Sequence, residues 1–143
     1  MLPEQLVAPV EGIAATTYIG PPLLPQAIVH EFLTAGHFDA AVAAVKAGLG
    51  ARRDAMLAAL EQHMPEGASW SRPEGGYFLW LDLPDGHSGA ALAAAAAERG
   101  VELIAGADFY PAGGGEESVR IAFSFPAVAE IEAGVATLGE LLR

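Results

Sequence analysis

The sequence predicts a small α+β domain in which helices pack against a mostly antiparallel sheet. Three observations predict this class. Apolar residues recur at helical spacing in several segments, short aromatic and aliphatic runs lie between those segments, and Gly or Pro separates the two kinds of run. The 143 residues fit one compact domain, long enough to bury roughly two thirds of the surface that its unfolded form exposes.

Residues 1–24 are expected to form an irregular N-terminal arm. Prolines and glycines are dense in this stretch, which argues against a long regular helix. The run Ala14–Ile19 is expected to be extended or briefly helical, and nothing local covers its apolar side chains. We therefore expect the arm to lie on another surface and the domain itself to occupy residues 25–143.

Two helices are predicted after the arm. Pro25 suits a first helical turn and Gly36 suits the left-handed residue that ends a helix, so one helix is expected over about residues 25–35. A longer apolar stripe at helical spacing begins near Phe38 and predicts a second helix that reaches about Met64.

Four strands and two more helices are predicted in the rest of the chain. The strands are expected in apolar or aromatic runs, at residues 68–72, 76–82, 101–104 and 118–124. The first two strands flank Pro73–Gly76 and are expected to pair antiparallel. Ser88 caps an alanine-rich helix that ends at Gly100, and Pro126 opens the last helix.

Composition excludes several classes of function. Seven basic and eighteen acidic residues give a net charge of −11, so this chain is not expected to contact nucleic acid. There is no cysteine, and the four histidines lack zinc-site spacing, so no metal site is expected. No run approaches the ~20 apolar residues of a membrane span, and a cytoplasmic protein without membrane contact is expected.

The apolar content is high for so small a domain. Hydrophobic residues make up 52% of the chain and the mean hydropathy is +0.35. Such a composition indicates that some apolar surface serves a partner rather than the core. Association with a second subunit, as a homo-oligomer, is therefore expected.

Arg120 has the strongest claim to a functional role. It lies in the apolar run Ser118–Ser124, between Val119 and Ile121, and Phe123 is expected on its own face. An arginine in this setting needs an acidic or anionic partner to offset desolvation. The residues alone favour an ordinary ion pair within the protein over a binding site for a ligand anion.

Two glycine-rich stretches are open to more than one interpretation. Gly75 and Gly76 suit a hairpin turn that needs positive φ, or a close approach of backbone to a ligand. Residues 113–115 are three glycines, but they lead into a strand and lack the Lys-Ser/Thr of a phosphate loop. A flexible surface turn is expected there.

Two stretches carry a resemblance to a known family. The segment Arg72-Pro-Glu-Gly-Gly-Tyr-Phe-Leu-Trp-Leu-Asp-Leu-Pro84 and the segment Ser118-Val-Arg-Ile-Ala-Phe-Ser124 resemble the C-terminal part of class I/II aminotransferases, which are pyridoxal-phosphate enzymes of fold type I. The resemblance covers essentially the whole chain. It is strongest toward aminoadipate-type aminotransferases and the aminotransferase-like domains of transcription regulators, and it implies the small-domain fold of these proteins.

The resemblance also implies a set of substrate-binding residues. Arg120 would pair with the α-carboxylate of an amino-acid or 2-oxo-acid substrate, and Gly75 and Gly76 would match the family's Pro-x-Gly-Gly-x-Phe signature. Tyr110 and Phe109 would line the entrance to the same site, whereas an aromatic residue that follows a strand lies more often in the core. Tyr18 would approach it from the arm.

The catalytic half of the family's site is not expected in this chain. Lys46 is the only lysine and lies in the middle of a predicted helix, whereas the family's Schiff-base lysine lies in a Ser-x-Ser-Lys-type loop. Leu6–Pro9 resembles the stretch that follows this loop, so the chain is expected to begin just downstream of it. No catalytic or cofactor-binding residue is expected here, and pyridoxal phosphate, the cofactor of the full-length family, is not expected to bind this chain alone.

Three hypotheses remain open. The first is a truncated small domain of an aminotransferase, whose partner is the missing large domain or another subunit. The second is the effector-binding part of a transcription regulator, in which Arg120 binds an amino-acid-like ligand without turnover. The third is a stand-alone interaction module without catalysis. The substrate's side chain is not predicted by any of them.

Overall fold

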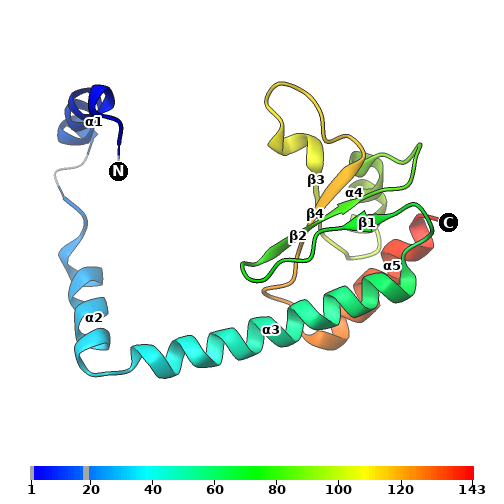
Figure 1. Ribbon diagram of the computed structural model, residues 1–143, viewed down its shortest axis with the longest axis horizontal. Coiled ribbons are helices and arrows are strands. Elements are labelled where there is room, and N and C mark those ends of the chain that lie inside the picture. The colour runs from blue at the N-terminus through cyan, green and yellow to red at the C-terminus, as the bar shows by residue number, and fades with distance from the viewer. Residues whose placement is uncertain (1, 18–19) are drawn as a thin grey trace. The chain divides into compact units, whose positions relative to one another are not determined.

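The computed structural model describes residues 2–17 and 20–143 (Figure 1). Its elements follow one another as α1 (Glu4–Thr17), α2 (Leu23–Thr34), α3 (Phe38–His63), β1 (Ser69–Trp70), β2 (Phe78–Asp82), α4 (Gly89–Ala97), β3 (Ile104–Ala105), the 3-10 turn η1 (Gly106–Phe109), β4 (Ser118–Ala122) and α5 (Val128–Leu141). The chain divides into two compact units, Met1–Val42 and Ala43–Arg143. The predicted α+β class is confirmed.

The first unit contains a helix where an irregular arm was expected. α1 continues through Pro9, so the prediction that prolines prevent a long helix in residues 1–24 is wrong. Pro3 precedes the helix and accepts a bond from the Leu6 N–H at 2.9 Å, a position that proline tolerates. Pro9 has no N–H for the helix ladder, and its neighbours Ala8 and Glu11 are good helix formers. The division into an arm over 1–24 and a domain over 25–143 stays a prediction.

The second helix of this unit is confirmed. α2 begins two residues before the predicted start, and Gly36 follows it with a φ of 78°. Neither α1 nor α2 has a buried residue among those described. Their exposed large apolar side chains are Leu6, Val7, Val10, Ile13, Leu23, Leu24, Ile28, Val29, Phe32 and Leu33. These two helices therefore do not build a core of their own.

The second unit is built on one four-stranded sheet, in the order β1-β2-β4-β3. Every described pair of neighbouring strands is antiparallel, and the predicted pairing of the first two strands is confirmed. In the register, Trp80 lies opposite Arg120 across β2 and β4, and Ile104 lies opposite Arg120 across β3 and β4. Arg120 therefore sits on a central strand with a partner strand on each side.

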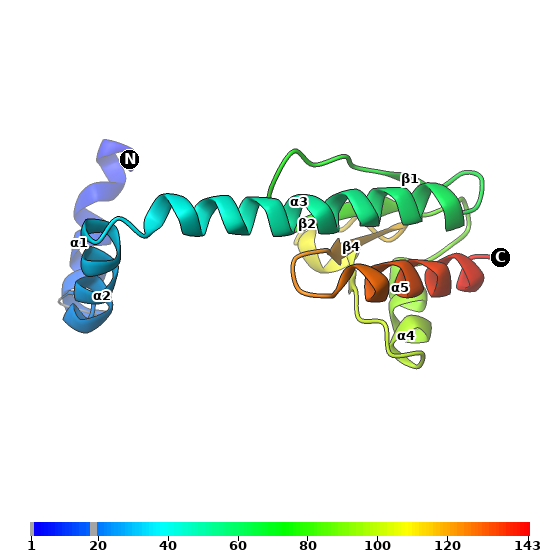
Figure 2. The same cartoon turned by 90° about the horizontal axis from the view of Figure 1, so that it is seen from below.

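One face of the sheet carries the core. Helices α3 and α5 lie along this face (Figure 2). The buried apolar residues come from α3, α4, α5, the sheet and the residues that follow β2, β4 and α5: Met56, Ala59, Leu60, Leu79, Leu81, Leu83, Leu92, Ala96, Val119, Ile121, Phe123, Ile131, Val135, Leu138 and Leu142. Gly139 allows α5 to approach the end of α3, because a Cβ there would meet the backbone of His63. Since the core packs on one face of the sheet, the side chains of the other face are free to form a binding site.

The third predicted strand is shifted along the chain. A strand was expected at residues 101–104, whereas β3 covers Ile104 and Ala105. The end of α4 explains the shift, since the N–H of Val101 donates to the carbonyl of Ala96 at 2.9 Å and completes the helix terminus. Residues bound in this way are not free to join the sheet.

Candidate functional site

Arg120 lies on the sheet face opposite the core. Its neighbours Val119 and Ile121 are buried among the core residues, and side chains alternate between the faces of a strand. Trp80 and Ile104 are its cross-strand neighbours on the same face. The expectation that Phe123 shares this face is wrong, because three steps along a strand reverse the face, and Phe123 is in the core.

Two aromatic rings flank the guanidinium of Arg120. Its central carbon lies over the ring of Phe78, 4.1 Å from the centroid, and over the ring of Phe109, 4.2 Å from the centroid. These are distances at which a cation is attracted by the face of an aromatic ring. The rings cover the guanidinium without using its terminal N–H groups, so these groups stay available as donors to an anion.

No protein partner satisfies Arg120 within residues 2–17 and 20–143. Its Nε is buried and makes no hydrogen bond there. The ion pairs found in the same residues involve other arginines, namely Arg53–Asp54, Arg72–Glu61 and Arg99–Glu140. The ordinary ion pair that the residues alone favoured is therefore not formed in the described part of the chain.

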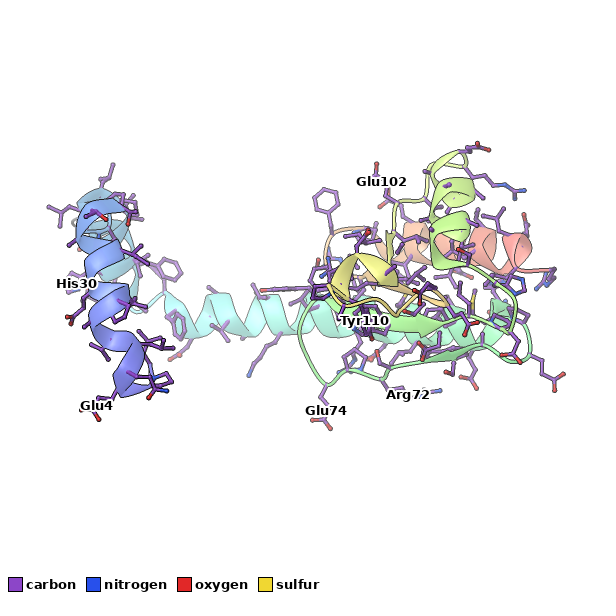
Figure 3. All side chains as sticks on the ribbon, turned by 90° about the horizontal axis from the view of Figure 1, so that it is seen from above. Glu4, His30, Arg72, Glu74, Glu102 and Tyr110 are labelled. Atoms are coloured by element: carbon purple, nitrogen blue, oxygen red, sulfur yellow. The ribbon has the colours of Figure 1, made fainter. Side chains whose placement is uncertain are left out.

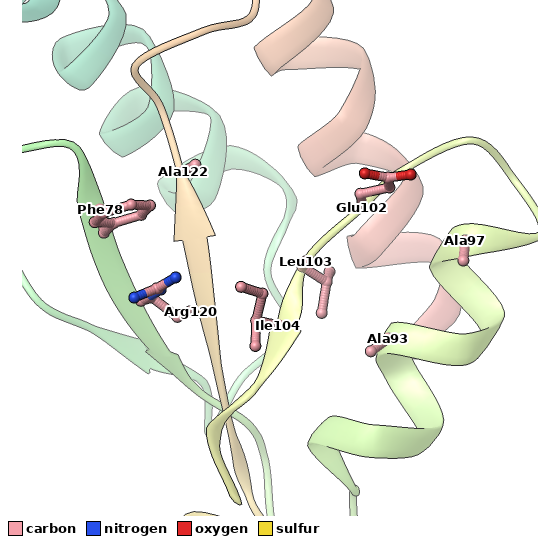
Figure 4. Close-up of a pocket in the computed structure, with 8 residues that line it drawn as sticks. All are labelled: Phe78, Ala93, Ala97, Glu102, Leu103, Ile104, Arg120 and Ala122. Carbon is pink, nitrogen blue, oxygen red and sulfur yellow. The ribbon is translucent and has the colours of Figure 1, made fainter. Parts of the chain in front are cut away.

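A surface pocket of about 340 Å³ adjoins Arg120 (Figure 4). Its lining consists of Phe78, Ala93, Ala97, Glu102, Leu103, Ile104, Arg120 and Ala122. Arg120 supplies the positive charge of this lining and Glu102 the negative charge, while the other members are apolar. A pocket of this kind suits a small ligand that has an anionic group and an apolar body.

The loop after β3 carries two aromatic residues of this face, Phe109 and Tyr110. Trp80 contacts the ring of Phe109 edge-on, with centroids 5.4 Å apart, and approaches the ring of Tyr110 at 6.5 Å. Tyr110 lies next to η1 (Figure 3). The structure thus joins Arg120 and Tyr110, two of the predicted site residues, through Trp80 and Phe109.

The three-glycine turn has a packing role that the sequence did not reveal. Gly115 has a φ of 75°, and a Cβ added there would lie 2.6 Å from the ring of Tyr110. A Cβ on Gly106 would meet Ser118 and the carbonyl of Gly115. The turn was expected to be a flexible surface feature, but its glycines make room for an aromatic ring.

The remaining predicted site residues are not joined to Arg120 by any described contact. Gly75 and Gly76 lie in the loop between β1 and β2. The same loop carries Arg72 and Glu74, which Figure 3 labels. Gly76 has a φ of 81°, as the turn interpretation requires, and a Cβ on either glycine would meet nothing within 4 Å. Tyr18 lies outside the described residues. The substrate-binding roles of these three residues stay predictions.

Phe78 and Trp80 were missed as site residues. The sequence contained a signal for them, because they alternate with Leu79 and Leu81 along one strand. Once the leucines are assigned to the core, the aromatic pair must lie on the other face. The missing information was which strand pairs with that of Arg120.

The described residues do not fit pyridoxal phosphate as a covalently held cofactor. Lys46, the chain's single lysine, is exposed on α3 and is not part of the pocket lining. A Schiff base to the cofactor needs a lysine amine at the site.

No helix in residues 2–17 and 20–143 is both long and apolar enough to cross a membrane.

Comparisons of this chain with known proteins all point to aminotransferase-like proteins. The model of the aspartate amino-transferase family matches residues 5–141. The 2-aminoadipate transaminase of Thermus thermophilus is 35% identical over 122 residues, which are 85% of this chain and 30% of that protein. An uncharacterized helix-turn-helix-type transcriptional regulator of Bacillus subtilis, YdfD, is 28% identical over 99% of this chain and 29% of its own length.

A solved structure agrees with these relatives. The α-aminoadipate aminotransferase LysN of Thermus thermophilus, crystallised with N-(5'-phosphopyridoxyl)-L-leucine, superposes with a TM-score of 0.85 at 33% identity. The alignment covers 99% of this chain and 36% of LysN. The chain therefore spans about a third of that structure and less than a third of the two relatives. By the family model and these similarities, the chain belongs to the aspartate aminotransferase family and has a fold type I aminotransferase-like domain.

Proposed function

We propose that this chain is the substrate-carboxylate-binding part of a pyridoxal-phosphate-dependent aminotransferase, which transfers an amino group between an amino acid and a 2-oxo acid. One observation carries the proposal. The guanidinium of Arg120 lines a pocket, is flanked by two aromatic rings and has no carboxylate partner in the described chain. Family membership favours a substrate carboxylate as the missing partner.

The physical argument begins with desolvation. A partly buried cation is costly unless an anion or hydrogen-bond acceptors compensate it. The planar fork of Arg120 offers two parallel N–H donors, which match the two oxygens of a carboxylate better than an ammonium group does. A bound carboxylate would therefore complete an arrangement that the protein leaves incomplete.

The contribution of this chain would be orientation. Holding the carboxylate at Arg120 fixes one end of the substrate, and fixed geometry lowers the entropic part of a reaction barrier. In the complete enzyme, pyridoxal phosphate supplies the electron sink that stabilises negative charge at the substrate's Cα. We propose that the lysine and the cofactor site are supplied by the rest of the protein or by another subunit, because Lys46 is exposed and outside the pocket.

A second candidate function is effector binding in a transcription regulator. The similarity to YdfD, which covers 99% of this chain, favours it. In this function Arg120 would bind the carboxylate of an amino-acid-like effector, and no turnover would follow. An in-frame winged-helix region in the gene upstream of Met1 would favour the regulator, and an in-frame lysine loop without one would favour the enzyme.

A third candidate is an interaction module without catalysis, and the exposed apolar side chains of α1 and α2 favour it. Such a module would pair with a second copy of itself. Its mass in solution would then depend on protein concentration.

The carboxylate site is tested by pyruvate, a 2-oxo acid, titrated into the 15N-labelled chain. We expect saturable shifts around the Arg120 pocket in the wild type and an affinity at least about tenfold weaker in Arg120→Gln, because the charged donor pair is lost. Arg99→Gln is the matched control, since Arg99 is an exposed arginine paired with Glu140. Equal affinity of Arg120→Gln and the wild type would contradict the proposal.

A further inference from the structure

The aromatic rings around Arg120 indicate that other residues affect ligand binding by holding its guanidinium in place. This inference rests on the proposed function, in which Arg120 receives a carboxylate. We propose that Phe109 is a positioning residue that, together with Phe78, fixes the guanidinium of Arg120, and that the packing of Tyr110 against Gly115 fixes Phe109 in turn.

The guanidinium needs such support because hydrogen bonds do not provide it. An arginine side chain has several rotatable bonds, and a partner at Nε commonly restricts them. Here the Nε of Arg120 is buried and has no hydrogen-bond partner in residues 2–17 and 20–143. What holds the group is instead the pair of rings, Phe78 at 4.1 Å and Phe109 at 4.2 Å.

Phe78 and Phe109 are held by different parts of the fold. Phe78 belongs to β2 and is fixed by the sheet, whose register places it opposite Ala122. Phe109 is the last residue of η1, outside the sheet, and has 38% of its surface exposed. Its edge-on contact with Trp80, at 5.4 Å, orients the ring but does not fix the backbone that carries it.

The backbone of Phe109 is fixed through the next residue. The ring of Tyr110 occupies space that a Cβ on Gly115 would fill, and a Cβ on Gly114 would lie 3.3 Å from the same ring. The carbonyl of Tyr110 accepts a bond from the Gly113 N–H at 3.0 Å. The hydroxyl of Ser118, the first residue of β4, donates to the carbonyl of Gly115 at 3.1 Å. The loop is thereby closed onto the strand that carries Arg120.

A series of contacts therefore connects the glycine turn at residues 113–115 to the guanidinium of Arg120. Gly115 accommodates Tyr110, Tyr110 fixes the end of η1, and Phe109 at that end covers the guanidinium of Arg120. Positioning of this kind lowers the entropy that ligand binding would otherwise have to remove. Loss of the Phe109 ring should therefore weaken carboxylate binding although Arg120 itself remains.

The test uses the side-chain Nε–Hε signal of Arg120 in 15N-labelled protein, assigned by its absence in Arg120→Gln. In Phe109→Leu we expect this signal to lose part of the ring-current shift, its heteronuclear NOE to fall, and the Kd for pyruvate to rise about three- to tenfold. Phe109→Tyr keeps a ring and should restore all three quantities. Phe125→Leu is the matched control, because Phe125 is 92% exposed.

Three other outcomes would contradict the positioning role of Phe109. If the Arg120 signal and the Kd for pyruvate are unchanged in Phe109→Leu, the positioning role is wrong while the proposed function stands. A higher Kd with an unchanged heteronuclear NOE of Arg120 would show that Phe109 contacts the ligand directly, which also overturns positioning. Absence of Arg120-dependent pyruvate binding in the wild type would remove the proposed function and this inference together.

Discussion

Arg120 differs from the paired arginines of this protein in what surrounds it. Arg53, Arg72 and Arg99 each meet a carboxylate at 2.6 to 3.1 Å, on side chains that are partly or largely exposed. Such surface pairs contribute little to stability. Arg120 instead meets two aromatic rings and lines a pocket. This difference in surroundings supports a binding role for Arg120 in particular.

The glycine turn yields a prediction at the same scale. Gly113→Ala should destabilise the fold by about 1–2 kcal/mol, because an alanine at positive φ is strained. Gly115→Ala should cost more and displace Tyr110, since its Cβ would also lie 2.6 Å from the ring. Gly113 is the matched control, because a Cβ there meets nothing within 4 Å. Denaturant unfolding measures both free energies, and equal losses would contradict the packing role of Gly115.

Some of the site could be predicted from individual residues and some could not. Arg120 was identified from its apolar strand setting and from a family resemblance, and the structure places it beside a pocket. Phe109 was predicted, together with Tyr110, only to line the entrance to the site. Its contact with the guanidinium depends on how a loop of irregular backbone folds back, and hydrophobic periodicity carries no information about such a loop.

At the scale of elements, helices α2 to α5 were predicted close to their observed bounds. Long apolar stripes, an N-cap at Ser88 and a left-handed glycine after α2 are local signals. They depend only on residues within or next to each helix, so they can be recognised in the sequence. α1 was missed because the dense prolines and glycines of residues 1–24 argue against a long helix, whereas the observed helix contains Pro9. β3 was misplaced because the end of α4 retains Val101, a contact that propensity does not describe.

The packing of α3 on the sheet gives a prediction at this scale. Leu60 is completely buried in α3, so Leu60→Ala should lower the free energy of unfolding by about 2–5 kcal/mol through lost burial and a residual cavity. Val45 lies on the same helix but is 56% exposed, and Val45→Ala should change this free energy by less than about 0.5 kcal/mol. Urea midpoints at unchanged m-value test the difference, and equal effects would refute the assignment of this face of α3 to the core.

At the scale of the whole molecule, the chain matches about a third of LysN and contains the part of the family's site that binds the carboxylate in our proposal. The other part requires a lysine that forms a Schiff base. The single lysine of this chain, Lys46, is exposed on a helix and outside the pocket. In our proposal, Arg120 and the cofactor chemistry therefore belong to different segments.

The absence of a lysine from the Arg120 pocket leads to a prediction about the cofactor. Addition of pyridoxal phosphate to the chain should give no specific aldimine absorbance, and borohydride should trap no stoichiometric adduct at Lys46. Lys46→Arg should therefore behave like the wild type in the same assay. A one-to-one adduct at Lys46, found by mass spectrometry after borohydride treatment, would contradict this account of the chain.

The most direct measurement is a crystal structure of the chain grown with pyruvate. The account predicts both carboxylate oxygens within about 2.7–2.9 Å of the terminal nitrogens of Arg120, with Phe78 and Phe109 still over the guanidinium. An Arg120 side chain that is instead paired with a carboxylate of the protein, together with a pocket that holds no pyruvate, would contradict it.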